Sequence, residues 1–289
     1  MALKMRRHLM AALPELRHEP TGRRVRVLHG GRTLCDTTSA RLVWEPRRLV
    51  PVYAVPEDRL DATLRPAGEP VVGPTVDLPP ALGPDDFARH TCAGRSMDVE
   101  VDGTVLERAA FRPADPDLAG YVVLDFTAFD WLEEDRPAVG HPHDPFKRID
   151  TLPSSRHVVV SLDGTVLADS REAVALLETH LPIRWYLPRS DVRTDLLEAS
   201  DHRTTCAYKG HASYFSITGA GGAGRDVAWT YEDPLHDALP VRRLVCFFSE
   251  RTDLTLDGVT VERPVTPWSR PEEQRRHFER GGLETMELG

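Results

Sequence analysis

The chain contains one domain-sized pattern twice. The run Gly31–Asp36 (GRTLCD) returns as Gly164–Asp169 (GTVLAD), and Glu45 meets Glu178 at the same spacing. Further segments match in the same order: Pro56 with Pro188, Thr91–Ala93 with Thr205–Ala207, Ala110–Phe111 with Ala228–Trp229, Asp115–Pro116 with Asp233–Pro234, and Asp130 with Asp253. The repeated unit is longer than a solenoid repeat and large enough to bury its own core, so the sequence predicts two tandem domains.

A chain of 289 residues has room for two domains of ordinary size, neither of which needs a disulfide or a metal to be stable. We expect, in chain order, an N-terminal extension, a degenerate first repeat domain, a connector rich in Pro and His, a motif-bearing second repeat domain and a C-terminal tail. Their predicted bounds are residues 1–21, 22–135, 136–153, 154–265 and 266–289.

The residue patterns predict a mainly β protein, with two tandem antiparallel β-tent-like domains and few short helices. Each copy opens with two apolar runs around a Gly-containing turn, which is typical of a hairpin. Alternating or aromatic runs in the second copy predict strands at 158–162, 184–187, 214–217, 227–231, 244–248 and 254–261. Helical patterns are short and occur at 8–13, 190–197 and 270–280.

Charge and composition exclude several classes of protein. A formal charge of −9 argues against binding to the phosphates of nucleic acid, which needs a concentrated basic surface. Every apolar run is interrupted well before it reaches the length of a membrane span. The four cysteines form no Cys-x-x-Cys pair, so the usual zinc and redox motifs are absent. We expect a cytoplasmic, bacterial protein with reduced thiols, no cofactor and no membrane partner.

Polar residues distinguish the second copy from the first. Alignment of the copies places Arg184 opposite Val52, Tyr186 opposite Ala54 and Tyr231 opposite Pro113. The segment Tyr208–Gly210 has no counterpart in this alignment, because Gly94 follows Ala93 directly. Polar and aromatic groups near strand ends are typical of a small-molecule site, so we expect one in the second copy.

The same residues resemble a known family. The second copy, over about residues 156–261, is similar to a domain of unknown function labelled nucleotidyltransferase-like, and the first copy is similar more loosely. The motifs that carry the resemblance are Glu178–Thr179, Leu181–Pro188, Thr205–Gly210, Ala212–Tyr214 and Ala228–Pro234. The resemblance implies a fold similar to the β-tent of methionine sulfoxide reductase B and yippee-like proteins, without their zinc cysteines. This chain departs from the family pattern at Ala207, where Pro is usual, and at Trp185, where Tyr is usual.

Three residues are candidates for catalysis: Lys209, Cys206 and Tyr231. A buried lysine loses its proton more easily and can then act as a base or form a Schiff base, although an ion pair with Glu178 is the simpler alternative. A nearby cation favours a reactive Cys206 thiolate, but Cys92 stands in the matching place of the first copy, which favours a packing role. The predicted ligand-binding residues are Glu178, Arg184, Tyr186, Tyr208, Tyr214 and Trp229.

Several of these residues have a second interpretation. Arg184 suits a carboxylate or phosphate, but it could equally pair with Glu178. Trp229 has Phe111 as its counterpart and therefore fits a core position. His202 and His211 flank the motif, and an imidazole is a group that can serve as an acid or a base. The loop Gly219–Gly224 lacks the Gly-Lys-Ser/Thr ending of a phosphate loop and lies between two strands.

Our leading expectation is a second domain that binds a small anionic or carbonyl-bearing metabolite and uses Lys209 without a metal or nucleotide cofactor. A module that binds a ligand or a partner without catalysis is the alternative. Nucleotidyl transfer, as the family label suggests, is a third hypothesis, although no paired carboxylates in a Gly-Ser context support it.

Overall fold

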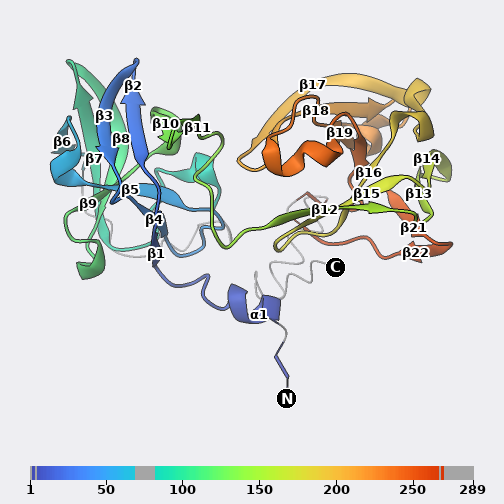
Figure 1. The fold of residues 1–289 in the computed structure, drawn as a ribbon, viewed down its shortest axis with the longest axis horizontal. Helices are drawn as coiled ribbons and strands as arrows, with labels where there is room; N and C mark the ends of the chain where they lie inside the picture. Colours follow the sequence, from blue (N-terminus) through green and yellow to red (C-terminus); the bar gives the residue numbers. More distant parts are fainter. Residues whose placement is uncertain (1, 4, 69–81, 267, 270–289) are drawn as a thin grey trace. The chain divides into compact units, whose positions relative to one another are not determined.

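The computed structural model describes residues 2–3, 5–68, 82–266 and 268–269. The chain divides into two compact units, Met1–Asp144 and Pro145–Gly289. Figure 1 shows that both units consist mainly of strands. The predicted mainly β, tandem antiparallel architecture is therefore confirmed.

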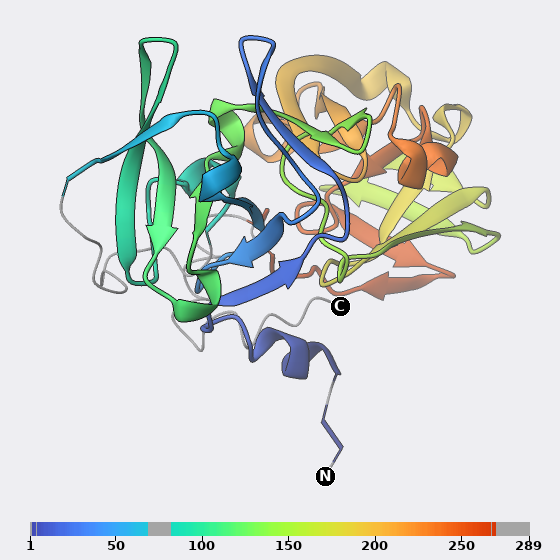
Figure 2. The same ribbon diagram turned by 60° about the vertical axis from the view of Figure 1, so that its left-hand side comes forward.

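The first unit contains two antiparallel sheets. Its seven-stranded sheet runs in the order β1 (Arg17–Pro20), β4 (Arg41–Trp44), β5 (Val52–Pro56), β9 (Tyr121–Leu124), β8 (Thr104–Pro113), β7 (Gly94–Val101) and β6 (Thr63–Pro66). Its four-stranded sheet runs in the order β11 (Arg136–Pro137), β10 (Asp130–Glu133), β2 (Val25–His29) and β3 (Arg32–Thr37). The blue hairpin of β2 and β3 is clear in Figure 2.

The second unit repeats this arrangement. Its larger sheet runs in the order β12 (Ile149–Ser154), β15 (Ala173–Glu178), β16 (Arg184–Leu187), β20 (Val245–Phe247), β19 (Ala228–Thr230), β18 (Gly210–Ile217) and β17 (Leu197–Cys206). Its smaller sheet runs in the order β14 (Thr165–Ser170), β13 (Val158–Leu162), β21 (Asp253–Leu256) and β22 (Val259–Val261). Each described strand thus has a counterpart in the first unit, which confirms the duplication read from the sequence.

The described helices are short. The helix α1 (Met5–Met10) overlaps the predicted segment 8–13. The others are 3-10 turns: η1 (Glu57–Arg59), η2 (Pro84–Asp86), η3 (Pro116–Leu118), η4 (Phe126–Ala128), η5 (Arg189–Asp191), η6 (Thr194–Leu196), η7 (Gly221–Gly224) and η8 (His236–Val241). The helical segment expected within 190–197 is thus replaced by η5 and η6, and the one expected at 270–280 lies outside the described residues.

Strand register gives a residue-by-residue match between the units. In the first unit, Trp44 on β4 pairs with Arg17 on β1; in the second, Leu177 on β15 pairs with Asp150 on β12. The residue that follows in each unit is a glutamate, so Glu45 is equivalent to Glu178, as the sequence suggested. Ser96 pairs with Phe111 as Tyr214 pairs with Trp229, so Ser96 is equivalent to Tyr214.

The same register corrects one part of the sequence alignment. Counting back from Ser96 and Tyr214 along the chain places His90–Cys92 at the positions of Tyr208–Gly210. The first unit therefore has residues where the sequence alignment left a gap. Matching Thr91–Ala93 to Thr205–Ala207 was misleading because the connection from β6 to β7 is much longer than the connection from β17 to β18.

Apolar side chains fill each unit between its sheets. In the first unit, the core includes Val25, Val27, Tyr53, Val99 and Trp131, all nearly inaccessible. In the second, one cluster includes Val158, Leu187 and Val245, and a second cluster on the large sheet is rich in aromatic rings. All four cysteines are free thiols, as expected. Within the described part of the chain, no helix has the length and apolar character needed to cross a membrane.

Candidate functional site

A pocket of about 370 Å³ lies on the second unit, in the range of small-molecule sites. We call it the β17–β18 pocket, since His202, Thr204 and Tyr214 come from these strands. The turn at η7 and the segments that follow β20 and β22 provide the rest of the lining: Gly222, Arg225, Asp226, Phe248, Arg251 and Trp268. Of the nine ligand-binding and catalytic residues predicted from the sequence, Tyr214 lines this pocket.

Aromatic rings form one wall of the β17–β18 pocket. The Tyr214 and Phe248 rings are nearly parallel, with an interplanar angle of 17° and centroids 6.4 Å apart. The His202 ring meets the Tyr214 ring edge-on at 4.5 Å. The Tyr214 hydroxyl is held by a 2.9 Å hydrogen bond with the Thr204 hydroxyl. The wall is thus built from side chains whose orientation is set before any ligand arrives.

Cationic side chains lie beside these rings. The Arg251 guanidinium donates hydrogen bonds to the carbonyl oxygens of Ala223 and Asp226, at 3.2 and 3.4 Å, and so ties the segment after β20 to the turn at η7. Arg225 is exposed and lies 3.6 Å from the Asp226 carboxylate. The pocket therefore has two arginines and one aspartate in its lining.

Arg184 is buried behind the aromatic wall. Its guanidinium makes a two-pronged contact with the Glu250 carboxylate, at 2.6 and 2.7 Å. Burial lowers the pKa of Arg184, but the ion pair with Glu250 outweighs this and the net pKa is raised. The structural pairing considered for Arg184 is present, but its partner is Glu250 and not Glu178, because β16 places the guanidinium beside Glu250. Since this carboxylate fills the fork, Arg184 does not face the pocket as an anion-binding group.

Arg184 instead supports aromatic rings. Its guanidinium lies 5.5 to 5.6 Å from the ring centroids of Trp229, Phe248 and Trp268. Glu250 also accepts a 2.6 Å hydrogen bond from the Thr266 hydroxyl, which holds the segment that carries Trp268. One buried ion pair thus connects β16, the turn after β20 and the chain beyond β22.

Lys209 and Glu178 form a largely buried ion pair, the simpler alternative weighed from the sequence. The side chains are 11% and 9% exposed. Burial lowers the pKa of Lys209, but the Glu178 carboxylate and the Cys206 thiol raise it more, so the net pKa lies above its ordinary value. Burial alone would lower the lysine pKa, but the structure has the ion pair weighed as the alternative, because β15 places a carboxylate against the amine. Lys209 is therefore a protonated ammonium at neutral pH.

Tyr186, Tyr214, Trp229 and Tyr231 belong to the aromatic cluster on the large sheet. The Trp229 indole donates a 3.0 Å hydrogen bond to the Tyr186 hydroxyl, and the Tyr186 and Tyr231 rings are 6.5 Å apart. Burial raises the pKa of both tyrosines well above the ordinary value. Tyr208 is also buried, whereas Cys206 is partly exposed at the end of β17. Burial raises the pKa of Tyr214 as well, against the opposing charge of Lys209.

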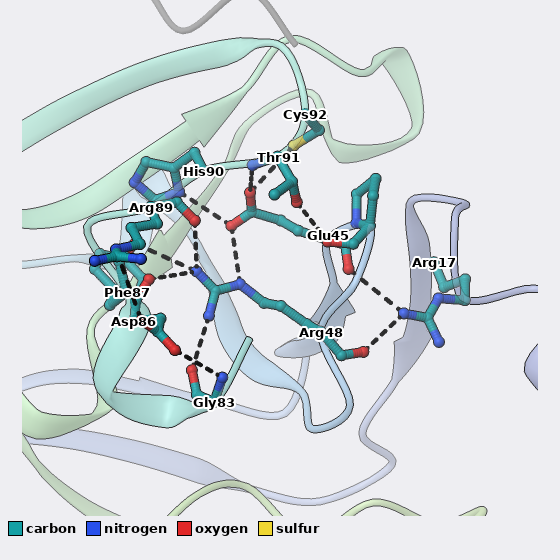
Figure 3. Close-up of polar contacts among 11 residues, drawn as sticks. Arg17, Glu45, Arg48, Gly83, Asp86, Phe87, Arg89, His90, Thr91 and Cys92 are labelled. Atoms are coloured by element: carbon teal, nitrogen blue, oxygen red, sulfur yellow. Dashed lines mark hydrogen bonds and ion pairs between the residues drawn. The ribbon is translucent and has the colours of Figure 1, made fainter. Parts of the chain in front are cut away.

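The first unit has a different polar cluster at the matching position. Figure 3 shows the Glu45 carboxylate, which accepts a 2.7 Å hydrogen bond from the Thr91 backbone N–H and lies 3.0 Å from His90 Nδ1. The Cys92 thiol and the Arg48 Nε also donate to it, at 3.8 and 3.4 Å. Burial raises the pKa of Glu45, but His90, Arg48 and the Thr91 N–H lower it more. Sequence comparison missed this cluster because it matched Thr91–Ala93 to Thr205–Ala207 and left Tyr208–Gly210 without a counterpart.

Arg48 extends this cluster into the long connection before β7. Its guanidinium donates to the carbonyl oxygens of Gly83, Asp86, Phe87 and Arg89, at 3.1 to 3.3 Å. These bonds fix the chain that leads to His90, whose ring stacks on Phe111 at 3.7 Å. The contacts are those of a structural anchor. In the described residues, no group of three or more His, Cys, Asp or Glu side chains is arranged to hold a metal ion.

Comparison with known proteins agrees with the duplicated fold. No curated protein matches the chain. The family model described as a domain of unknown function (DUF427) matches two segments, residues 17–72 and 150–258, one in each unit and together more than half of the chain. The chain therefore belongs to the DUF427 family.

Proposed function

We propose that the second unit binds a small anionic metabolite in the β17–β18 pocket. The observation that carries the proposal is the pocket itself, a concavity of ligand size in which two arginines outnumber one aspartate. The ion pair of Arg225 with Asp226 is exposed and 3.6 Å long, so it holds Arg225 weakly and leaves it able to turn toward an anion.

The protonated state of Lys209 favours binding without amine chemistry. A Schiff base needs a neutral amine, and the Glu178 carboxylate holds the proton on Lys209. Lys209 is instead held in its ion pair with Glu178 and does not line the pocket. This supports the non-catalytic alternative over an enzyme that uses Lys209.

Thermal shift and calorimetric titration of the full chain test the binding proposal. The probes are inorganic phosphate, citrate, pyruvate, benzoate and AMP, the last of which also tests the nucleotidyltransferase-like family label. We expect at least one probe to raise the melting temperature, and Arg225→Gln to weaken its binding about tenfold through loss of a charge-assisted hydrogen bond. Arg193→Gln removes an exposed arginine outside the pocket and should leave the affinity unchanged. Equal loss in both variants, or no binding of any probe, would refute the proposal.

Borohydride trapping separates binding from amine catalysis. Wild-type protein is incubated with pyruvate and borohydride, and the modified lysines are identified by mass spectrometry. We expect no adduct at Lys209, because a protonated amine does not attack a carbonyl. Lys147, which is more accessible, serves as the internal reference. Selective modification of Lys209 would favour the enzymatic alternative.

A further inference from the structure

We infer that the ligand of the β17–β18 pocket is an aromatic anion, a flat ring that carries a carboxylate or phosphate group. This inference rests on the proposed function, and it names the chemical class of the metabolite. Four of the nine lining residues have planar rings: His202, Tyr214, Phe248 and Trp268. Flat rings pack against one another through offset or edge-on contacts, so such a wall favours a planar ligand over a puckered one of equal size.

The rings are held in fixed positions. The rings of Phe248, Tyr214 and Trp229 contact one another, with centroid distances of 6.4 Å from Phe248 to Tyr214, 4.4 Å from Phe248 to Trp229 and 6.5 Å from Tyr214 to Trp229. Arg184 lies against Trp229, Phe248 and Trp268, and its own position is set by Glu250. A cation near the ring faces contributes to this order. A ligand that stacks here loses little binding energy to side-chain ordering.

Trp268 presents an exposed ring to a ligand. Its residue is 43% exposed although it lines the pocket, whereas Tyr214 and Phe248 are largely buried. Its backbone N–H donates a 3.2 Å hydrogen bond to the Thr266 hydroxyl, which itself donates to Glu250. The indole is thus anchored at its backbone while its ring remains open to contact.

The charged part of the pocket lies in the turn at η7. Gly224 allows this turn to approach β18, because a Cβ at this position would lie 2.9 Å from Ile217 Cβ and 2.7 Å from Ala220 Cβ. The close approach places Arg225 and Asp226 in the same pocket as the aromatic wall. One small molecule in this pocket can therefore stack on the aromatic wall and also bind Arg225 through its anionic group.

The first unit has lost these features at the matching positions. Register places Ser96 opposite Tyr214 and Val52 opposite Arg184. Leu124 matches Phe247 in the same way, so Asp125 follows at the position of Phe248. An aspartate and a serine in place of two rings remove both the stacking surface and the preference for an anion. The second unit alone is equipped for an aromatic anion among these matched positions.

Matched ligand pairs test the inference by calorimetric titration of the full chain. Benzoate is compared with cyclohexanecarboxylate, which has the same charge and a puckered ring, and with neutral benzyl alcohol. AMP is compared with ribose 5-phosphate, which tests a phosphate as the anionic group. We expect at least one aromatic anion to bind about fivefold or more tightly than its non-aromatic partner. Benzyl alcohol should bind more weakly than benzoate.

Variants locate the effect at the aromatic wall. Trp268→Leu should remove most of the preference for the aromatic partner, and Trp268→Phe should restore part of it. Phe146→Leu changes an exposed ring outside the pocket and should have no effect. Circular dichroism melting of each variant verifies that the protein is folded, which is expected because Trp268 is substantially exposed.

The outcomes distinguish this inference from the proposed function. Tight binding of cyclohexanecarboxylate or ribose 5-phosphate, with no gain from the ring, would overturn the aromatic inference and leave an anion-binding pocket. If benzyl alcohol binds as tightly as benzoate, the claim that the ligand is an anion is overturned in both the proposed function and this inference. Absence of binding by every anion to folded protein would overturn both proposals together.

Discussion

The two units place a glutamate at the same point of the same fold and give it different partners. Glu45 is completely buried and accepts from Arg48, Thr91 and Cys92, with His90 beside it. Glu178 faces Lys209 and retains slight exposure. Both units keep a glutamate at this position; its partner in the second unit comes from the chain that enters β18, whereas in the first unit the chain that enters β7 and Arg48 after β4 both contribute.

The largest expected effect comes from removing each glutamate in turn. Glu45→Ala leaves the Arg48 guanidinium buried, and arginine cannot release its proton, so we expect a loss of about 3–5 kcal/mol. Glu178→Ala leaves Lys209, which can become neutral when desolvated, so we expect a smaller loss of about 1–3 kcal/mol. Hydrogen exchange with mass spectrometry reports the stability of each unit within the full chain. Equal losses would show that the difference in partners has no energetic consequence.

A further prediction concerns the acid dependence of stability in the first unit, through Glu133 on β10. Burial raises the pKa of Glu133, but His143, Tyr53 and Arg23 lower it more, and the net value falls from 4.5 to about 2. A lowered native pKa contributes stability that is complete above pH 4.5 and is lost as the pH falls toward 2. The contribution at neutral pH is about 3 kcal/mol at most.

Glu133→Gln tests this assignment. The variant should be less stable than the wild type at pH 7, and the difference should disappear near pH 2. Urea denaturation is repeated across this pH range for both proteins. Hydrogen exchange of the amides in the first unit reports the free energy of unfolding at each pH. A difference that is independent of pH would indicate that Glu133 acts through packing and not through its charge.

A smaller difference is expected at Gly94 and its structural counterpart Ala212. A Cβ on Gly94 would overlap the Phe111 ring and lie 2.5 Å from the Arg112 carbonyl oxygen. Gly94→Ala should therefore destabilise the first unit by about 1–3 kcal/mol through overpacking. In the second unit Ala212 already carries this atom and is buried, so Ala212→Gly should cost only about 1 kcal/mol. Denaturation midpoints compare the two variants, and a neutral Gly94→Ala would contradict the packing argument.

Local patterns were sufficient for much of the fold. The predicted strand at 184–187 coincides with β16, and the run 214–217 falls within β18, because β-branched and aromatic residues favour a half-buried sheet. The duplication, and the equivalence of Glu45 in the first copy to Glu178 in the second, also followed from the sequence. The alignment failed at His90–Cys92, because the connection from β6 to β7 is longer than that from β17 to β18 and no recognisable motif marks the extra residues.

The candidate site was less predictable than the fold. Tyr214, one of the predicted ligand-binding residues, and His202, noted beside the motif, both line the pocket, and ligand binding by them stays a prediction. Arg225, Arg251 and Trp268 were missed, since each belongs to a different segment and none has a motif that links it to the others. Arg184 and Lys209 were recognised as unusual charges, but their roles depended on Glu250 and Glu178, whose positions no local pattern specifies. Catalytic use of Lys209, Cys206 and Tyr231 stays a prediction.

The repeat and the residue patterns were enough to predict a tandem pair of mainly β domains, but the contrast they suggested between a polar second copy and a stripped first copy overlooked the Glu45 cluster. Hydrophobic periodicity depends on neighbouring residues, and a repeat is found by comparing the sequence with itself, so both can be recognised without the folded structure. The pairing of the charges and the set of side chains that share a pocket became clear from the folded structure alone. These depend on contacts between residues far apart in sequence, as when Arg184 on β16 meets Glu250 after β20 and thereby supports Trp268 beyond β22.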